Sequence, residues 1–144
     1  MSRPIVVGSP YHELVKPIGR REKAALVLEI LRGYVRVRWL LWRRDLPAVV
    51  AELREDGLDT DRKRQAMGVR LGRAVERTLA WMPFDSRCLV RSLVLTGMLS
   101  RRGVGSRLVI GVNTVPRFSA HAWVESGDRV LLTPLADANR LVEL

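Results

Sequence analysis

The sequence predicts an α+β fold in which helices occupy the first part of the chain and a small antiparallel sheet the second. Before about residue 81, apolar residues recur at steps of three and four, which is the spacing of amphipathic helices. After residue 103 the pattern changes to three short strand-like runs over residues 106–112, 119–125 and 129–133. Because helices and strands are segregated instead of alternating, the sequence argues against a doubly wound parallel sheet.

The length of 144 residues fits a single domain, which is expected to span residues 1–144. Three prolines and two glycines make residues 1–20 an irregular lead-in. Residues 21–81 are expected to form a helical subdomain, and residues 82–144 a core that combines one helix with the strands. The change in composition near residue 82 is interpreted as a boundary between layers of one domain.

The first predicted helix begins at about Arg21 and carries large apolar side chains along one stripe. The members of this stripe are Leu28, Leu31, Val35, Trp39 and Trp42. Tryptophans at helical spacing are far more often part of a core than a ligand platform, so this stripe is expected to face the core.

Two further helices are predicted from their start signals. Asp45, followed by Pro47, begins a short helix that ends at Gly57, because aspartate caps helices and proline suits the first turn. Asp61 caps a third helix over about residues 62–81. Apolar residues recur at every fourth position of this helix: Met67, Leu71, Val75 and Leu79.

A fourth helix is predicted to carry the only cysteine of the chain, Cys88, in its first turn. Asp85 and Ser86 offer capping oxygens just before it, and Gly103 ends it. In the strand region, a turn over residues 126–128 is expected to join the last two strands into a hairpin.

The composition limits the classes of partner and compartment. A net charge of +10 comes mostly from scattered arginines, without a block of like charges or an aromatic RNA-stacking pattern, so no nucleic acid is expected to bind. A solvated basic face and an acidic partner both remain open. The sequence contains no apolar stretch that would predict a membrane span and no signal peptide, and its single cysteine favours the cytoplasm. No cofactor or metal is expected, because neither a phosphate-binding glycine loop nor a cluster of metal ligands is apparent.

The position of Cys88 is the strongest chemical signal in the sequence. At the start of a helix, free backbone N–H groups and the helix dipole favour thiolate over thiol, and the same groups can contribute to an oxyanion hole. The alternative is a small buried hydrophobic residue, since free cysteines are often buried. A neighbouring imidazole would favour the nucleophilic interpretation.

His121, one of two histidines in the chain, lies in the predicted strand Ser119–Glu125. Because side chains alternate along a strand, His121, Trp123 and Glu125 share one face, whereas Ala120, Ala122 and Val124 share the other. A strand that carries histidine, packed against a helix that carries cysteine in its first turn, is the arrangement of papain-like and transglutaminase-like thiol enzymes.

Three segments together resemble the transglutaminase-like cysteine peptidases of lasso-peptide biosynthesis. They are Cys88–Val104, Leu108–Val112 and His121–Glu125, and the resemblance covers about residues 82–133. It implies a transglutaminase-like core within residues 82–144 and removal of the leader peptide from a ribosomally made precursor. It also implies a separate leader-recognition protein, because this chain resembles the stand-alone peptidase half. A separate ATP-dependent lasso cyclase would then act on the freed core peptide.

The resemblance also assigns roles to residues. Cys88 would be the nucleophile, and His121 would be the general base and then the acid that protonates the leaving amine. Members of the family usually place an aspartate at the end of the next strand after the histidine strand, but this sequence has Thr133 at that position, with Asp137 as an alternative orienting residue.

Other functions remain open from the sequence. Trp123 and Asn113 are expected to contribute to substrate binding, although the loop after Asn113 can equally be a plain connector. A degenerate transglutaminase-like module that binds an acidic peptide or protein without catalysis is the principal alternative. Acyl transfer to an amine would use the same Cys88 and His121.

Overall fold

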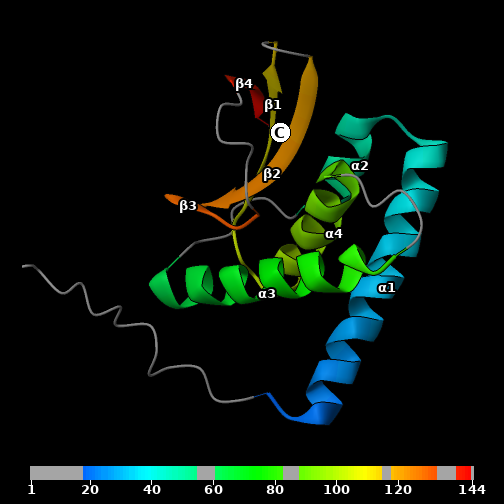
Figure 1. Ribbon diagram of the computed structural model, residues 1–144, viewed down its shortest axis with the longest axis vertical. Coiled ribbons are helices and arrows are strands. Elements are labelled where there is room, and N and C mark those ends of the chain that lie inside the picture. Colours follow the sequence, from blue (N-terminus) through cyan, green and yellow to red (C-terminus); the bar gives the residue numbers. More distant parts are fainter. Residues whose placement is uncertain (1–17, 55–60, 83–87, 115–117, 133–138, 144) are drawn as a thin grey trace, which may run out of the picture.

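The computed structural model describes residues 18–54, 61–82, 88–114, 118–132 and 139–143. Within these ranges the helices precede the strands, so the predicted α+β class is confirmed (Figure 1). The helices are α1 (Arg20–Arg43), α2 (Leu46–Leu53), α3 (Arg62–Ala80) and α4 (Cys88–Arg101). The strands are β1 (Arg107–Asn113), β2 (Ser119–Ser126), β3 (Arg129–Val130) and β4 (Asn139–Glu143).

The strands form one antiparallel sheet in the order β3-β2-β1-β4. The predicted hairpin between β2 and β3 is confirmed by the pairing of Ser126 with Arg129, and Gly127 supplies the positive φ of 59° in its turn. β3 is shorter than predicted, because it has only two residues. β4 was not predicted from the sequence, since its run of residues 139–143 is too short and too polar to show clear alternation.

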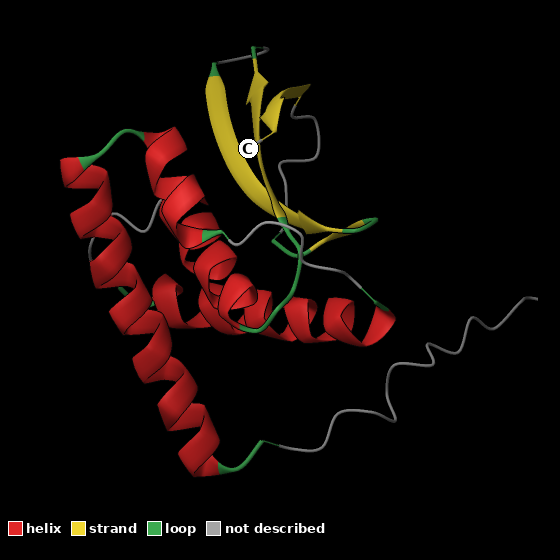
Figure 2. Ribbon diagram, turned by 180° about the vertical axis from the view of Figure 1, so that it is seen from behind, coloured by secondary structure: helices red, strands yellow, loops and turns green. Residues whose placement is uncertain are grey.

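α4 is the central helix of the structure. It packs against α1, α2 and α3 and also against β2, so it lies between the helical layer and the sheet (Figures 1 and 2). Val90 and every residue from 92 to 100 are buried, including the polar side chains of Ser92 and Thr96. Such complete burial on all sides is unusual for a helix of a small domain. Because α4 is held on all sides, the position of Cys88, its first residue, is fixed as well.

The predicted orientation of the first helix is wrong. α1 buries Ile30, Tyr34, Val37 and Leu40 against the core, and the tryptophan-bearing stripe lies on the opposite side of the helix. Trp42 is 79% exposed. The error has a physical cause: α1 is apolar on two opposite faces, and periodicity alone does not show which of two such faces meets the core.

The helix start signals have mixed outcomes. The Asp61 side chain accepts a hydrogen bond from the Arg64 N–H at 2.7 Å, which confirms this cap. Asp45 is at the cap position of α2 but makes no side-chain cap bond. The predicted stripe of α3 is buried at Leu71, Val75 and Leu79, whereas Met67 is 38% exposed. Gly57, Asp85 and Ser86 lie outside the described residues.

Two glycines of α3 allow the chain after β3 to approach the helix closely. A Cβ at Gly68 would lie 2.9 Å from the Leu131 side chain, and a Cβ at Gly72 would lie 2.2 Å from the Leu131 carbonyl oxygen. Both glycines are buried. Because real Cβ contacts are longer than 3.0 Å, the Leu131 backbone can occupy this position only against a residue without a side chain.

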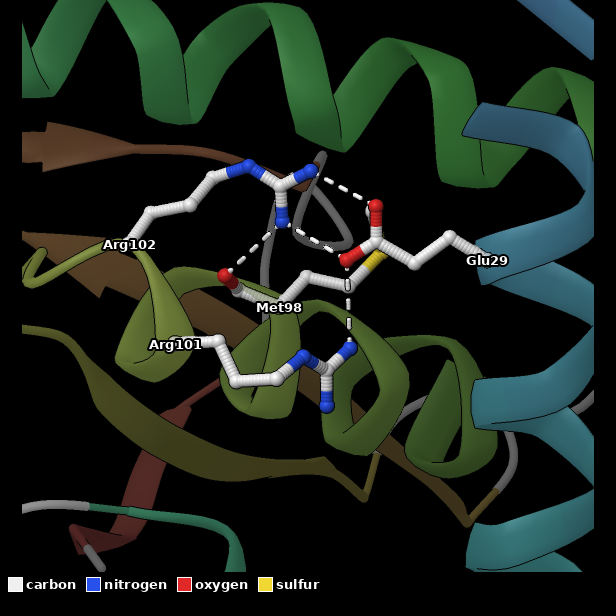
Figure 3. A network of polar contacts seen from close by, with 4 residues as sticks. All are labelled: Glu29, Met98, Arg101 and Arg102. Atoms are coloured by element: carbon white, nitrogen blue, oxygen red, sulfur yellow. Dashed lines mark hydrogen bonds and ion pairs between the residues drawn. The ribbon is translucent and has the colours of Figure 1, made fainter. Parts of the chain in front are cut away.

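A carboxylate on α1 holds the C-terminal end of α4 (Figure 3). Glu29 accepts two parallel hydrogen bonds from the Arg102 guanidinium, at 2.7 and 2.6 Å, and a third from Arg101 at 3.3 Å. Arg102 also donates to the carbonyl of Met98 at 3.2 Å, so it satisfies a carbonyl in the last turn. The Arg102 hydrogen bonds hold the pKa of Glu29 below its ordinary value, although burial acts in the opposite direction and Arg101 adds to the lowering.

Glu29→Gln is expected to lower the free energy of unfolding at pH 7 by about 1–2 kcal/mol, or about 3–6 °C in Tm. Since the folded-state pKa of Glu29 is depressed, its stabilising effect is complete above the ordinary glutamate pKa and is lost as the pH falls through the folded-state value. Denaturant unfolding at several pH values should therefore show the stabilities of the two proteins converging as the pH falls below the ordinary glutamate pKa and through the lower folded-state value.

The matched control for this prediction is Glu52→Gln. Glu52 pairs with Arg36 and Arg44, whose side chains are 48% and 53% exposed, so the loss should not exceed about 0.5 kcal/mol. Equal losses in the two variants, or a difference at Glu29 that does not change with pH, would contradict the role given to Glu29.

Candidate active site

Two side chains of α4 bind one residue of β2. The Cys88 Sγ accepts a hydrogen bond from the backbone N–H of Ala122 at 3.4 Å. The Ser92 hydroxyl donates to the carbonyl oxygen of the same residue at 3.1 Å. Cys88 and Ser92 are four residues apart and therefore share one face of the helix. Together they fix both the height and the rotation of the Cys88 end of α4 against the strand.

These contacts lie on the edge of β2 that faces away from β1. In an antiparallel ladder the N–H and C=O of one residue point to the same side, and alternate residues share that side. The Val124 carbonyl accepts from the Leu131 N–H on this edge, whereas Ala122, further along, is bonded by Cys88 and Ser92 instead. The two side chains of α4 thus satisfy backbone groups that a neighbouring strand would otherwise satisfy.

His121 directly precedes Ala122, so this contact brings the cysteine to the backbone of the histidine strand. The rings of His121 and Trp123 are inclined by 25° with centroids 6.2 Å apart, and the Trp123 Nε1–H donates to the Glu125 carboxylate at 2.8 Å. Glu125 is also 3.7 Å from the Arg107 guanidinium. The prediction that His121, Trp123 and Glu125 share one face is confirmed by these contacts.

The site residues differ in how far they are exposed to solvent. Cys88 and His121 are half-buried, whereas Trp123 is only 5% exposed. Gly111 is opposite His121 in the β1–β2 ladder, so no side chain on β1 occupies the position next to the imidazole. The thiol and the imidazole therefore lie at the margin of the core, each partly exposed, beside the nearly buried Trp123.

The remaining predicted site residues have different positions. Asn113 lies at the end of β1 and pairs with Ser119 of β2. Ser119 precedes His121 by two residues in β2. Thr133 and Asp137 lie outside the described residues, so the identity of the orienting residue stays a prediction. Ser92 and Gly111 were not predicted as site residues. Ser92 could have been found from its four-residue spacing to Cys88, but the position of Gly111 follows only from the strand register.

Within the described ranges, no group of three or more His, Cys, Asp or Glu side chains gathers closely enough to hold a metal ion. In the same ranges, no helix combines the length and the apolar character needed to cross a lipid bilayer.

Ser92→Ala is expected to destabilise the fold by about 1–3 kcal/mol, because it leaves the buried Ala122 carbonyl without its donor. Thr96→Val is the matched control. The Thr96 hydroxyl is equally buried, but it donates to the Ser92 carbonyl within its own helix and does not reach the sheet. Denaturant unfolding of both variants should show the larger loss for Ser92→Ala, and equal losses would contradict the link between α4 and β2.

Comparison with known proteins adds two findings. A family model described as the transglutaminase-like superfamily matches residues 31–143. The chain is also 46% identical over 48 residues to the microcin J25-processing protein McjB of Escherichia coli. This stretch covers 33% of the chain and 23% of McjB, so the match spans about a quarter of that relative. No solved structure matches the chain significantly. These similarities agree with the resemblance drawn from the sequence.

Proposed function

Because the chain belongs to the transglutaminase-like superfamily, we propose that it is a cysteine peptidase that removes the leader peptide from a lasso-peptide precursor. The observation that carries this proposal is the hydrogen bond between the Cys88 sulfur and the backbone of the residue that follows His121. The similarity to a microcin-processing protein supports a peptide as the substrate.

The proposed reaction begins at Cys88. His121 takes the thiol proton, and the sulfur attacks the carbonyl carbon of the scissile amide to form a tetrahedral intermediate. N–H groups in the first turn of α4 would stabilise the oxyanion, since the first turn of a helix leaves its N–H groups without partners within the helix. His121 then protonates the leaving amine as the C–N bond breaks, and a thioester remains on Cys88.

Hydrolysis of the thioester completes the cycle. His121 removes a proton from water, the resulting hydroxide attacks the thioester carbonyl, and the sulfur leaves with a proton returned from the imidazole. The Trp123 ring lies beside the imidazole, with centroids 6.2 Å apart, and would limit access of bulk water on that side. Thr133 or Asp137 is proposed to orient the ring. If an amine instead of water attacks the thioester, the same residues carry out acyl transfer.

The proposal includes partners for the reaction. The substrate is the precursor peptide, presented by a separate leader-recognition protein in the cytoplasm, and a lasso cyclase uses the product. Trp123 and Asn113 are proposed to contribute to the peptide site. Since Trp123 is only 5% exposed, its contribution would act mainly through the position of His121.

The test is to incubate a lasso precursor, its leader-recognition protein and this chain, and to follow the products by mass spectrometry. The wild-type chain should release the leader at one bond, and Cys88→Ala should not. Cleavage by Cys88→Ala at the wild-type rate would overturn the proposal. If the wild-type chain binds the precursor without cleaving it, and iodoacetamide fails to label Cys88, the chain is a non-catalytic binding module.

A further inference from the structure

α1 carries an apolar stripe that faces away from the rest of the molecule. We call it the outer stripe, and its members are Leu28, Leu31, Val35, Trp39 and Trp42. Leu28 is 48% exposed, Val35 66%, Trp39 49% and Trp42 79%. The other helices all lie on the opposite side of α1, where its buried face meets the core (Figures 1 and 2). Exposed apolar surface of this kind, bordered by polar residues, is typical of protein interaction sites.

The outer stripe is not smooth. A shallow depression of about 580 Å³ opens between side chains of successive turns, and Leu31, Arg32, Val35, Arg36 and Trp39 line it. Helices pack by placing side chains of one helix into the grooves of another. The depression is therefore suited to receive apolar side chains from a second helix that lies along α1.

The charges beside the outer stripe are predominantly positive. The Arg43 guanidinium lies over the Trp39 ring at 4.4 Å and within 5.8 Å of the Trp42 ring, so it remains at the surface beside both tryptophans. Arg36 shares Glu52 with Arg44. Across the described part of the chain, no acidic side chain forms an ion pair with Arg32, Arg38 or Arg43. The arginines beside the stripe thus outnumber the acids that could neutralise them.

From the apolar stripe and its arginine border, we propose that the outer stripe binds an acidic amphipathic helix of a partner protein. Leucine-like side chains of that helix would fill the depression, and its flanking carboxylates would pair with Arg32, Arg38 and Arg43. A second copy of this chain would bring the same arginines face to face and add the repulsion of two chains of charge +10. Charge complementarity therefore favours an acidic partner over self-association.

The test uses a synthetic helical peptide of about 20 residues, long enough to follow α1, with leucine on one face and glutamate on both flanks. Fluorescence anisotropy of the labelled peptide should show binding to the full chain. The double variant Trp39→Gln/Trp42→Gln should bind at least about tenfold more weakly. Trp81→Gln is the matched control, because Trp81 is 89% exposed and follows α3 instead of belonging to the stripe, so this variant should bind as the wild type does. A peptide with lysine in place of glutamate should not bind.

Several results would overturn the proposal. One is that the wild type and the double variant bind the acidic peptide with equal affinity. Another is that Trp81→Gln weakens peptide binding as much as the double variant does. A wild-type dimer in sedimentation experiments that the double variant dissociates would assign the stripe to a second copy. Binding to phosphatidylglycerol vesicles but not to the peptide would assign it to a lipid surface. The interaction is independent of the proposed peptidase, because Cys88→Ala should bind the peptide with unchanged affinity.

Discussion

Cys88→Ala should reduce peptide cleavage by about 10⁵-fold or more while the chain keeps its fold. The thiol supplies the bond that forms with the scissile carbonyl, and no other cysteine exists in the sequence to replace it. Alanine removes only the Sγ, which accepts one weak hydrogen bond from Ala122, so α4 keeps its Ser92 contact to β2. Single-turnover cleavage, measured beside the denaturant unfolding curve, separates loss of chemistry from loss of structure.

The same experiment tests whether Cys88 and His121 act as a unit. His121→Ala should cost a similar factor, and the double variant should be no slower than either single variant, because residues of one catalytic unit are strongly non-additive. His12→Ala, at the other histidine of the chain, is the control and should retain full activity. Multiplicative losses in the double variant would show that His121 does not act through Cys88.

Gly72→Ala is expected to have the largest effect on stability of any single methyl addition in α3. The added Cβ would lie 2.2 Å from the Leu131 carbonyl oxygen, a backbone atom that cannot rotate away as a side chain can. Either α3 or the chain after β3 must move, at a cost of about 3 kcal/mol. Denaturant unfolding should show this loss directly, together with reduced protection of the β2–β3 hairpin in hydrogen exchange.

Gly33→Ala is the matched control for Gly72→Ala. Gly33 also lies within a helix, but its Cβ would meet only the end of the Val94 side chain, at 3.2 Å. Alanine favours the helix over glycine by about 1 kcal/mol, and this gain in stability offsets the cost of a small shift of the Val94 side chain. A loss at Gly72 no larger than at Gly33 would contradict the tight contact between α3 and Leu131.

Local signals predicted most of the fold. Periodicity and capping residues located the helices, and alternation located β1 and β2, because these signals depend only on neighbours in the chain. The orientation of α1 did not follow from them, since Val37 and Val35 belong to opposite apolar faces and only packing selects one. The short, polar β4 was missed for the same reason: it depends on pairing with β1 for its structure.

The candidate site was predictable in part. Cys88 and His121 were identified by their spacing and by resemblance to a family, but the sequence does not reveal that Ala122 is the residue that joins their elements. That contact depends on the register of α4 against β2, which the buried Ser92 hydroxyl helps to set. The four-residue spacing places Ser92 on the helix face of Cys88, but it does not reveal which backbone group of the sheet the hydroxyl meets.

The burial of α4 has a consequence for how this protein can change. The proposed nucleophile is carried by the helix that tolerates substitution least, because residues 92–100 are enclosed on every side. A replacement at Leu93 or Leu95 that alters the packing would also displace the thiol. A substitution on α4 would therefore change the activity and the stability of the protein at the same time. Selection for new peptide specificity should therefore accumulate substitutions at exposed strand positions such as Ala120, next to His121, where the chain can vary without repacking its interior.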